Sequence, residues 1–368
     1  MTTDSKLAPA SNEPDQDERQ PSVLARLLPK LVLSLALGGA CAFLVSHGGV
    51  PLVPPADAFQ RIAPWTIPVY LLSLAAVHWF RATRWRFLIA PVKRVPLRDV
   101  VLLNWVGFFA IFALPLRLGE LARPALTKLR HGIPISVGLG TVAVERVIDG
   151  LITSFCVAWA LLVLPRLPSE DPIATLLPKY GYAALALFSC AFVALGLFLW
   201  QRELAKKLTR ITLGLVSPRI ADVLAQKVDN VADGIRSIGN PRLALMFLLE
   251  SGLYWGCNAV GVWLLGVGCG LPMTLGHAAA VMGVLAIGIL LPSGPGLFGN
   301  FQLAVSAALR LYFAESVVGH EGAVFIFLLY ALQSSVMILA GIIPLYALGL
   351  RMTDLMRLPP ESEYPAKP

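Results

Sequence analysis

The charged residues Glu145, Arg146 and Asp149 lie within an apolar stretch, residues 135–164. Glu145 and Asp149 are spaced i, i+4, so on a helix they project from one face. Ionisable groups inside a membrane helix are costly, and they usually face a charged partner or a wet cavity. We interpret them as a polar patch for a charged ligand. The structural alternative is an internal Glu–Arg pair, or a position at the membrane interface.

Glu250 is a second charged candidate, within the apolar stretch 243–267. The functional interpretation makes it a second candidate contact for the charged ligand, because ionisable groups inside a membrane helix usually face a partner or a wet cavity. The structural alternative is that Glu250 packs against Arg146 or Arg123.

The phrase L-P-x-x-x-G occurs twice, at 114–119 and at 291–296. Proline removes a backbone donor and glycine permits unusual dihedral angles, so each copy should interrupt a helix. In a membrane such an interruption is tolerated only where protein or water satisfies the freed backbone groups. The two breaks are therefore candidate parts of a site.

The two breaks offer different groups to an anion. Arginine presents a fork of donors that matches phosphate, and a helix N-terminus offers free backbone N–H groups. The alternative for the arginines is ordinary attraction to anionic lipid at the membrane surface. The first break contributes Arg117, Gly119, Glu120 and Arg123, and the second contributes Ser293, Gly294, Pro295 and Gly296.

The composition identifies an integral membrane protein. The chain of 368 residues is 57% hydrophobic and 14% charged, with a mean hydropathy of +0.71, whereas soluble domains are about 45–50% apolar and about 25% charged. The net charge of +8 is explained by cytoplasmic loops rather than by nucleic acid. The cysteines form no CxxC pair and no nucleotide or metalloenzyme motif is present, so we expect no metal, cofactor or catalytic residue.

Hydropathy divides the chain into a disordered cytoplasmic tail (1–28), a membrane domain (29–350) and a short cytoplasmic tail (351–368). The apolar runs 100–113 and 276–291 are shorter than the ~20 residues that a span needs, so they should enter the bilayer without crossing it. Residues 201–241 should form a cytoplasmic interfacial segment. The remaining runs predict about six full spans, near 29–46, 64–80, 135–164, 180–200, 243–267 and 323–350.

Charge sets the expected topology. If each L-P-x-x-x-G is the tip of a re-entrant hairpin, most of the 30 Lys and Arg residues lie on one face, which is cytoplasmic. The hairpins then enter from opposite sides, and the halves 64–200 and 243–350 form an inverted repeat, an architecture typical of transporters. The predicted fold is all-α and polytopic, in the cytoplasmic membrane, with both termini cytoplasmic.

The motifs resemble the lysylphosphatidylglycerol synthase transmembrane domain family. In that family an R-x-G-E-x-x-R-P-like run precedes E-R-x-x-D; here these are Arg117 to Pro124 and Glu145 to Asp149. The later run at 291–299 is similar to the family's P-x-P-G-G-x-G-x-x-E, but Asn300-Phe301-Gln302 stands where a Glu is common. The resemblance implies a flippase-like domain that handles lipid headgroups, without the soluble aminoacyltransferase domain.

The favoured hypothesis is transport of a phospholipid or a polyprenyl-phosphate lipid. The phosphate would meet Arg117 and Arg123, and any cationic part of the headgroup would meet Glu145 and Asp149. One alternative is a membrane glycosyltransferase that uses a lipid-linked sugar, with Asp57 or Glu170-Asp171 as its base. Another is an accessory subunit of a lipid-modifying enzyme; a second copy of the chain and such an enzyme are both candidate partners.

Overall fold

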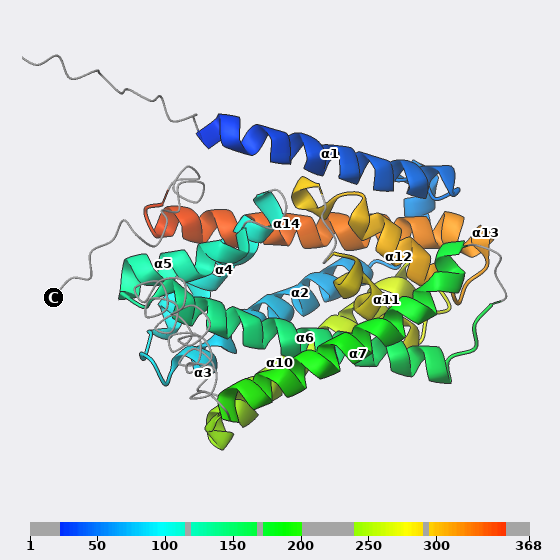
Figure 1. Ribbon diagram of the computed structural model, residues 1–368. Helices are drawn as coiled ribbons and strands as arrows, with labels where there is room; N and C mark the ends of the chain where they lie inside the picture. The colour runs from blue at the N-terminus through cyan, green and yellow to red at the C-terminus, as the bar shows by residue number, and fades with distance from the viewer. Residues whose placement is uncertain (1–22, 115–118, 168–171, 201–238, 290–293, 351–368) are drawn as a thin grey trace, which may run out of the picture.

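In the computed structural model the described residues are 23–114, 119–167, 172–200, 239–289 and 294–350. All regular secondary structure in these ranges is helical, and they contain no strand (Figure 1). The longer helices are α1 (Val23–His47), α2 (Thr66–Thr83), α4 (Leu97–Ala113), α5 (Ala122–His131), α6 (Ile135–Val163), α7 (Pro172–Trp200), α10 (Pro241–Gly268), α11 (Leu275–Gly288), α12 (Asn300–Arg310) and α14 (Ala323–Ala347). The short elements are η1 (Ala56–Arg61), α3 (Trp85–Ile89), η4 (Pro295–Leu297), α13 (Glu315–Val317) and the π-helical turn η5 (Val318–Gly322).

Local sequence signals explain where several helices begin and end. Asn240 caps α10 by accepting hydrogen bonds from the backbone N–H groups of Arg242 and Leu243, as N-cap residues do. Thr274 caps α11 in the same way. Gly132 ends α5 with a φ of 68°, a left-handed conformation that glycine adopts without steric cost.

Most of the expected apolar elements coincide with helices, with differences at the first two and at α7, which begins at Pro172 rather than near residue 180. α1 begins at Val23, inside the segment expected to be a disordered tail, and α2 continues beyond residue 80 to Thr83 before α3 follows. The rest of the N-terminal tail, the C-terminal tail and nearly all of the interfacial segment 201–241 lie outside the described residues.

Four helices among the described residues are long and apolar enough to cross a membrane. Two shorter apolar helices, Leu31–His47 and Leu275–Gly288, accompany them. The chain is therefore a multi-pass membrane protein whose described part is all-helical. The four long helices are Ile135–Val163, Leu176–Leu197, Pro241–Gly268 and Glu315–Ala347.

Hydrogen bonds between distant segments define two opposite ends of the helical bundle. At the first end, Lys93 Nζ donates to the carbonyl of His131 at 2.8 Å, and Arg130 donates to the carbonyl of Leu348. At the second end, the N–H of Ala63 donates to the carbonyl of Gly268 at 3.0 Å, and that of Leu167 donates to Leu311 at 2.9 Å. In Figure 1 α3 and α5 accordingly lie at one end, and α12 and α13 at the other.

The two broken-helix units start from opposite ends. The first unit, α4 and α5, begins beyond Lys93 and finishes at His131, both at the first end. The second unit, α11 and α12, begins after α10 finishes at Gly268 and ends beside Leu311, at the second end. The two units pack on different long helices, because α4 packs on α14 and α11 packs on α6. Beside them, α2 packs on α10.

Glycines allow the chain to fold back closely at both breaks. A Cβ on Gly119 would lie 2.0 Å from the carbonyl carbon of Ala110, so the chain after the first break presses directly on α4. At the second break a Cβ on Gly296 would lie 3.2 Å from Phe112 Cζ, on α4. The two units therefore meet at their interrupted ends, in the middle of the bundle.

Candidate functional site

A buried ion pair joins the end of α2 to the middle of α6. Arg84 donates to both carboxylate oxygens of Asp149, at 2.6 and 2.7 Å. Trp255 on α10 donates to the same carboxylate at 2.9 Å. The Arg84 side chain is only 1% exposed. A charge this deeply buried requires a partner of opposite charge, and here the partner is Asp149, whose two oxygens are both engaged.

A second pair joins the first broken unit to α6. Arg123, on α5, forms a two-pronged ion pair with Glu145 and also donates to Asn104 Oδ1 at 2.7 Å. The side chains of Arg123 and Glu145 are 8% and 2% exposed. The expected alternative of an internal Glu–Arg pair therefore describes Glu145, with Arg123 rather than its neighbour Arg146 as the partner.

A third ion pair joins Glu250, on α10, to Arg86. Arg86 on α3 donates to one carboxylate oxygen at 2.7 Å, and Thr83 donates to the other at 2.6 Å. The expectation that Glu250 packs against Arg146 or Arg123 is wrong, because its carboxylate instead binds Thr83 and Arg86 at the α2–α3 corner.

A cavity of about 520 Å³ lies where the two broken units meet. Residues on either side of each break line it, Phe112 and Glu120 from the first and Ile289 and Leu297 from the second. Its walls are largely apolar, with a few polar groups, as in most ligand sites. The polar and aromatic lining includes Arg81, Arg146, Asp149, Thr153, Tyr254, Trp255, Asn258, Tyr330, Gln333 and Ser334.

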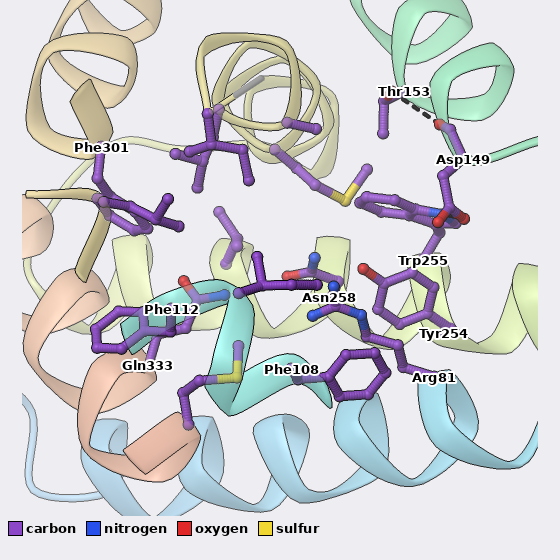
Figure 2. Close-up of a pocket in the computed structure, with 18 of the residues that line it drawn as sticks. Arg81, Phe108, Phe112, Asp149, Thr153, Tyr254, Trp255, Asn258, Phe301 and Gln333 are labelled. Carbon is purple, nitrogen blue, oxygen red and sulfur yellow. Dashed lines mark hydrogen bonds between the residues drawn. The ribbon is translucent and has the colours of Figure 1, made fainter. Parts of the chain in front are cut away.

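Two arginines give this cavity its positive charge. Arg81 comes from α2, and Figure 2 shows its guanidinium among Phe108, Tyr254 and Asn258, with its Cζ 4.0 Å from the centre of the Phe108 ring. Arg146 comes from α6, and its buried Nε has no hydrogen-bond partner. Within the described ranges no carboxylate pairs with Arg81 or Arg146, and their two like charges repel each other.

Only some of the predicted site residues line the cavity. Glu120, Arg146 and Asp149 do so. Gly119 and Arg123 border a much smaller void beside it, together with Glu120 and Arg146. Glu145 and Glu250 are engaged in the pairs described above, and Arg117 and Ser293 lie outside the described residues.

The second break contributes through its backbone. Gly294 packs against the backbone of α1 at Ser34 and Gly38, and Pro295 opens η4. The carbonyl of Gly296 accepts a hydrogen bond from the Tyr330 hydroxyl at 3.1 Å. Leu297, directly after it, lines the cavity.

Sequence reasoning missed Arg81, Tyr254, Trp255, Asn258 and Gln333. The expected span 64–80 ends one residue before Arg81, whereas Arg81 lies on the last turn of α2 and lines the cavity. The amides did carry a signal. Asn258 and Gln333 are polar residues inside long apolar helices, the kind of residue that marks a functional site in a membrane.

The described residues contain no cluster of His, Cys, Asp and Glu that could hold a metal ion. No significantly similar protein was found among curated sequences, and none among solved structures. The model of one family, the lysylphosphatidylglycerol synthase TM region, matches residues 31–351. That match covers both broken units, the cavity and every described charged pair, so the chain belongs to the lysylphosphatidylglycerol synthase transmembrane region family.

Proposed function

We propose that this protein binds a lipid with a phosphate-containing headgroup in the central cavity and translocates it across the membrane. The observation that carries this proposal is the position of Arg81 and Arg146. Both line a largely apolar cavity between two broken-helix units that start from opposite ends of the bundle. Membership of a family named for a lipid synthase's membrane region supports a lipid as the ligand.

The charge of the cavity favours an anion. Arginine binds phosphate through several donors at once, and Arg81 and Arg146 have no carboxylate partner in the described part of the chain. The expectation that a cationic headgroup would meet Glu145 and Asp149 loses its support, because Arg123 and Arg84 already neutralise these carboxylates.

The apolar lining favours a ligand that carries a hydrocarbon chain. Phe301 and Leu329 both line the cavity, and in Figure 2 Phe301 lies on the opposite side of it from Arg81. A phosphate with an attached acyl or prenyl chain matches this division between charged and apolar walls.

The arrangement of the two units supports alternating access. In the proposed topology α4–α5 and α11–α12 are re-entrant hairpins from opposite leaflets, within about six full spans. Both hairpins reach the cavity, so movement of either one opens it to a different side. The first end, which carries Lys93, Arg130 and His131, would face the cytoplasm.

Lipid scrambling in proteoliposomes tests the proposal. Vesicles with fluorescent phosphatidylglycerol in both leaflets are treated with a membrane-impermeant quencher, and transport makes the inner-leaflet lipid accessible. We expect Arg81→Gln and Arg146→Gln to slow scrambling at least tenfold, as loss of a charge-assisted contact predicts. The matched control, Arg166→Gln, changes an exposed arginine outside the cavity and should scramble like the wild type.

Two results would contradict the proposal. A scrambling rate of the wild type equal to that of empty vesicles would rule out transport. In that case sugar transfer by the purified protein would favour the glycosyltransferase, and stable copurification with a lipid-modifying enzyme would favour the accessory subunit. Scrambling that survives in both cavity variants would remove the assigned site.

A further inference from the structure

His78, on α2, is a buried histidine whose ring has no hydrogen-bond partner. The residue is 4% exposed, and within the described part of the chain neither Nδ1 nor Nε2 is paired. Leaving a buried polar group unsatisfied is unfavourable by about 1–3 kcal/mol. An apolar side chain of similar size would avoid that loss, so packing alone does not account for an imidazole at this position.

His78 lies next to the cation that lines the central cavity. His78 and Arg81 are three residues apart on α2, a spacing that places two side chains on one face of a helix. Both face α4, because the Trp105 indole donates to the His78 carbonyl at 3.4 Å and Arg81 Cζ lies 4.0 Å from the centre of the Phe108 ring. Figure 2 shows Arg81 beside Phe108. The charge of Arg81 acts on His78 across this short distance.

The helices that pack on α2 are α3, α4, α10 and α14. Beyond its first turn α4 carries no ionisable side chain. The ionisable groups of this region that are engaged with a partner are Arg84 with Asp149, Arg86 with Glu250, and Asp99 with His131. The groups that ionise only well above neutral pH are Tyr70, Tyr254, Cys257, Tyr330 and Tyr346. Among the described residues, the charge that acts on His78 is therefore that of Arg81.

An anion on Arg81 changes this balance. A proton on His78 would place a second positive charge beside Arg81, and the two like charges would repel each other. An anion bound to Arg81 compensates its charge, which removes the repulsion and favours the protonated imidazole. Anion binding and proton binding are then linked, so each strengthens the other by the same factor.

We propose that the protein couples lipid transport to a proton, which His78 binds when a phosphate-containing lipid occupies Arg81 and Arg146. This proposal rests on the proposed function. The imidazole takes the proton from water on the side where the lipid enters, and it returns the proton to water on the side where the lipid leaves. No covalent bond to the lipid forms or breaks.

The coupling has an electrostatic benefit. A phosphodiester carries one negative charge, so a lipid of this kind that crosses with one proton moves no net charge. An anionic lipid that crosses alone meets the membrane potential, which is worth about 2.3 kcal/mol per elementary charge for each 100 mV. A histidine suits this role because its charge changes between about pH 5 and pH 8.

The first experiment counts protons during binding. Short-chain phosphatidylglycerol, whose phosphodiester stays ionised, is added to the detergent-solubilised full-length protein in weakly buffered solution with a pH-indicator dye. We expect uptake of up to about one proton per bound lipid, and an affinity roughly tenfold higher near pH 5.5 than near pH 8. Binding without proton uptake and with a pH-independent affinity overturns the coupling but leaves the proposed function intact. Absence of binding overturns both.

A variant assigns the proton to His78. His78→Gln keeps a polar side chain but has no group that titrates in this range, so lipid binding should persist without proton uptake. His47→Gln, at an exposed position of α1, is the matched control and should behave like the wild type. Proton uptake that persists in folded His78→Gln protein overturns the assignment to His78. The wild-type measurements still test the coupling if this variant does not fold.

A pH gradient tests the coupling during transport. Proteoliposomes with an alkaline lumen are placed in acidic medium, and the distribution of fluorescent phosphatidylglycerol between the leaflets is compared with that in protein-free vesicles. The wild type should accumulate the lipid in the inner leaflet, whereas His78→Gln should distribute it evenly. A wild type that scrambles the lipid but distributes it evenly in the gradient overturns proton coupling.

Discussion

Arg84 donates two hydrogen bonds to Asp149, at 2.6 and 2.7 Å, and this pair joins the α2–α3 corner to the middle of α6. Trp255 adds α10 to the same carboxylate. The pair thus lies at the junction of three segments that surround the cavity. Asp149 lines that cavity, but both of its carboxylate oxygens are engaged by Arg84 and Trp255. Its main role is therefore to hold α2, α6 and α10 together.

Breaking this pair should cost more stability than breaking the pair of Glu250. Arg84→Met leaves Asp149 buried without its partner, a loss of about 3–5 kcal/mol. Arg86→Met should cost only about 1 kcal/mol, because the Arg86 side chain is 39% exposed and that of Arg84 1%. Unfolding temperatures of the purified variants, followed by tryptophan fluorescence, measure the difference. Equal losses would show that burial does not set the strength of these pairs.

Replacement of Glu145 should act on folding rather than on lipid recognition. Glu145→Ala strands the buried guanidinium of Arg123 and should cost about 3–5 kcal/mol. The double variant Arg123→Met/Glu145→Leu removes both charges and should recover most of that loss. Neither residue lines the main cavity, so scrambling per folded molecule should persist in the double variant. A stable Glu145→Ala protein that binds no lipid would restore Glu145 as a direct headgroup contact.

The first break should not tolerate a methyl group. Gly119→Ala places a Cβ 2.0 Å from the Ala110 carbonyl carbon, so the chain must move away from α4 and the cavity wall shifts with it. Folded yield and scrambling should both fall sharply. Gly256→Ala, on α10, is the matched control, because a Cβ at this position would have no neighbouring atom within 4 Å. This substitution should stabilise the helix by about 0.5–1 kcal/mol. Normal scrambling by Gly119→Ala would contradict the close approach.

Cysteine accessibility tests the opposed orientation of the two units. In a background without the native cysteines, Leu129→Cys on α5 and Glu315→Cys in α13 should react with a membrane-impermeant maleimide from opposite sides. Both positions are exposed and lie at opposite ends of the bundle. Leu187→Cys, exposed on the apolar face of α7, should react slowly from either side. Labelling of residues 129 and 315 from one side only would exclude an inverted repeat.

The sequence by itself determined the helices and their breaks, because these depend on neighbouring residues. Composition assigned the chain to the membrane, and the apolar runs predicted α6 and α10 to within a few residues. The L-P-x-x-x-G phrases located the two interruptions, since proline and glycine act on their own backbone. The motifs around Arg117 and Glu145 were enough to suggest the family that the comparison then confirmed.

Only the tertiary structure decided which charges pair and which remain available. Asp149 and Glu250 find partners 65 and 164 residues away in sequence, and helical spacing carries no information about such contacts. The same holds for Arg81, which lies just beyond the expected span 64–80 but lines the cavity because α2 continues to Thr83. Glu145, Asp149 and Glu250, which the sequence marked as ligand groups, are structural partners because Arg123, Arg84 and Arg86 pair with them in the fold. The charged groups that remain available to a ligand, Arg81 and Arg146, could not be singled out from the sequence pattern around them.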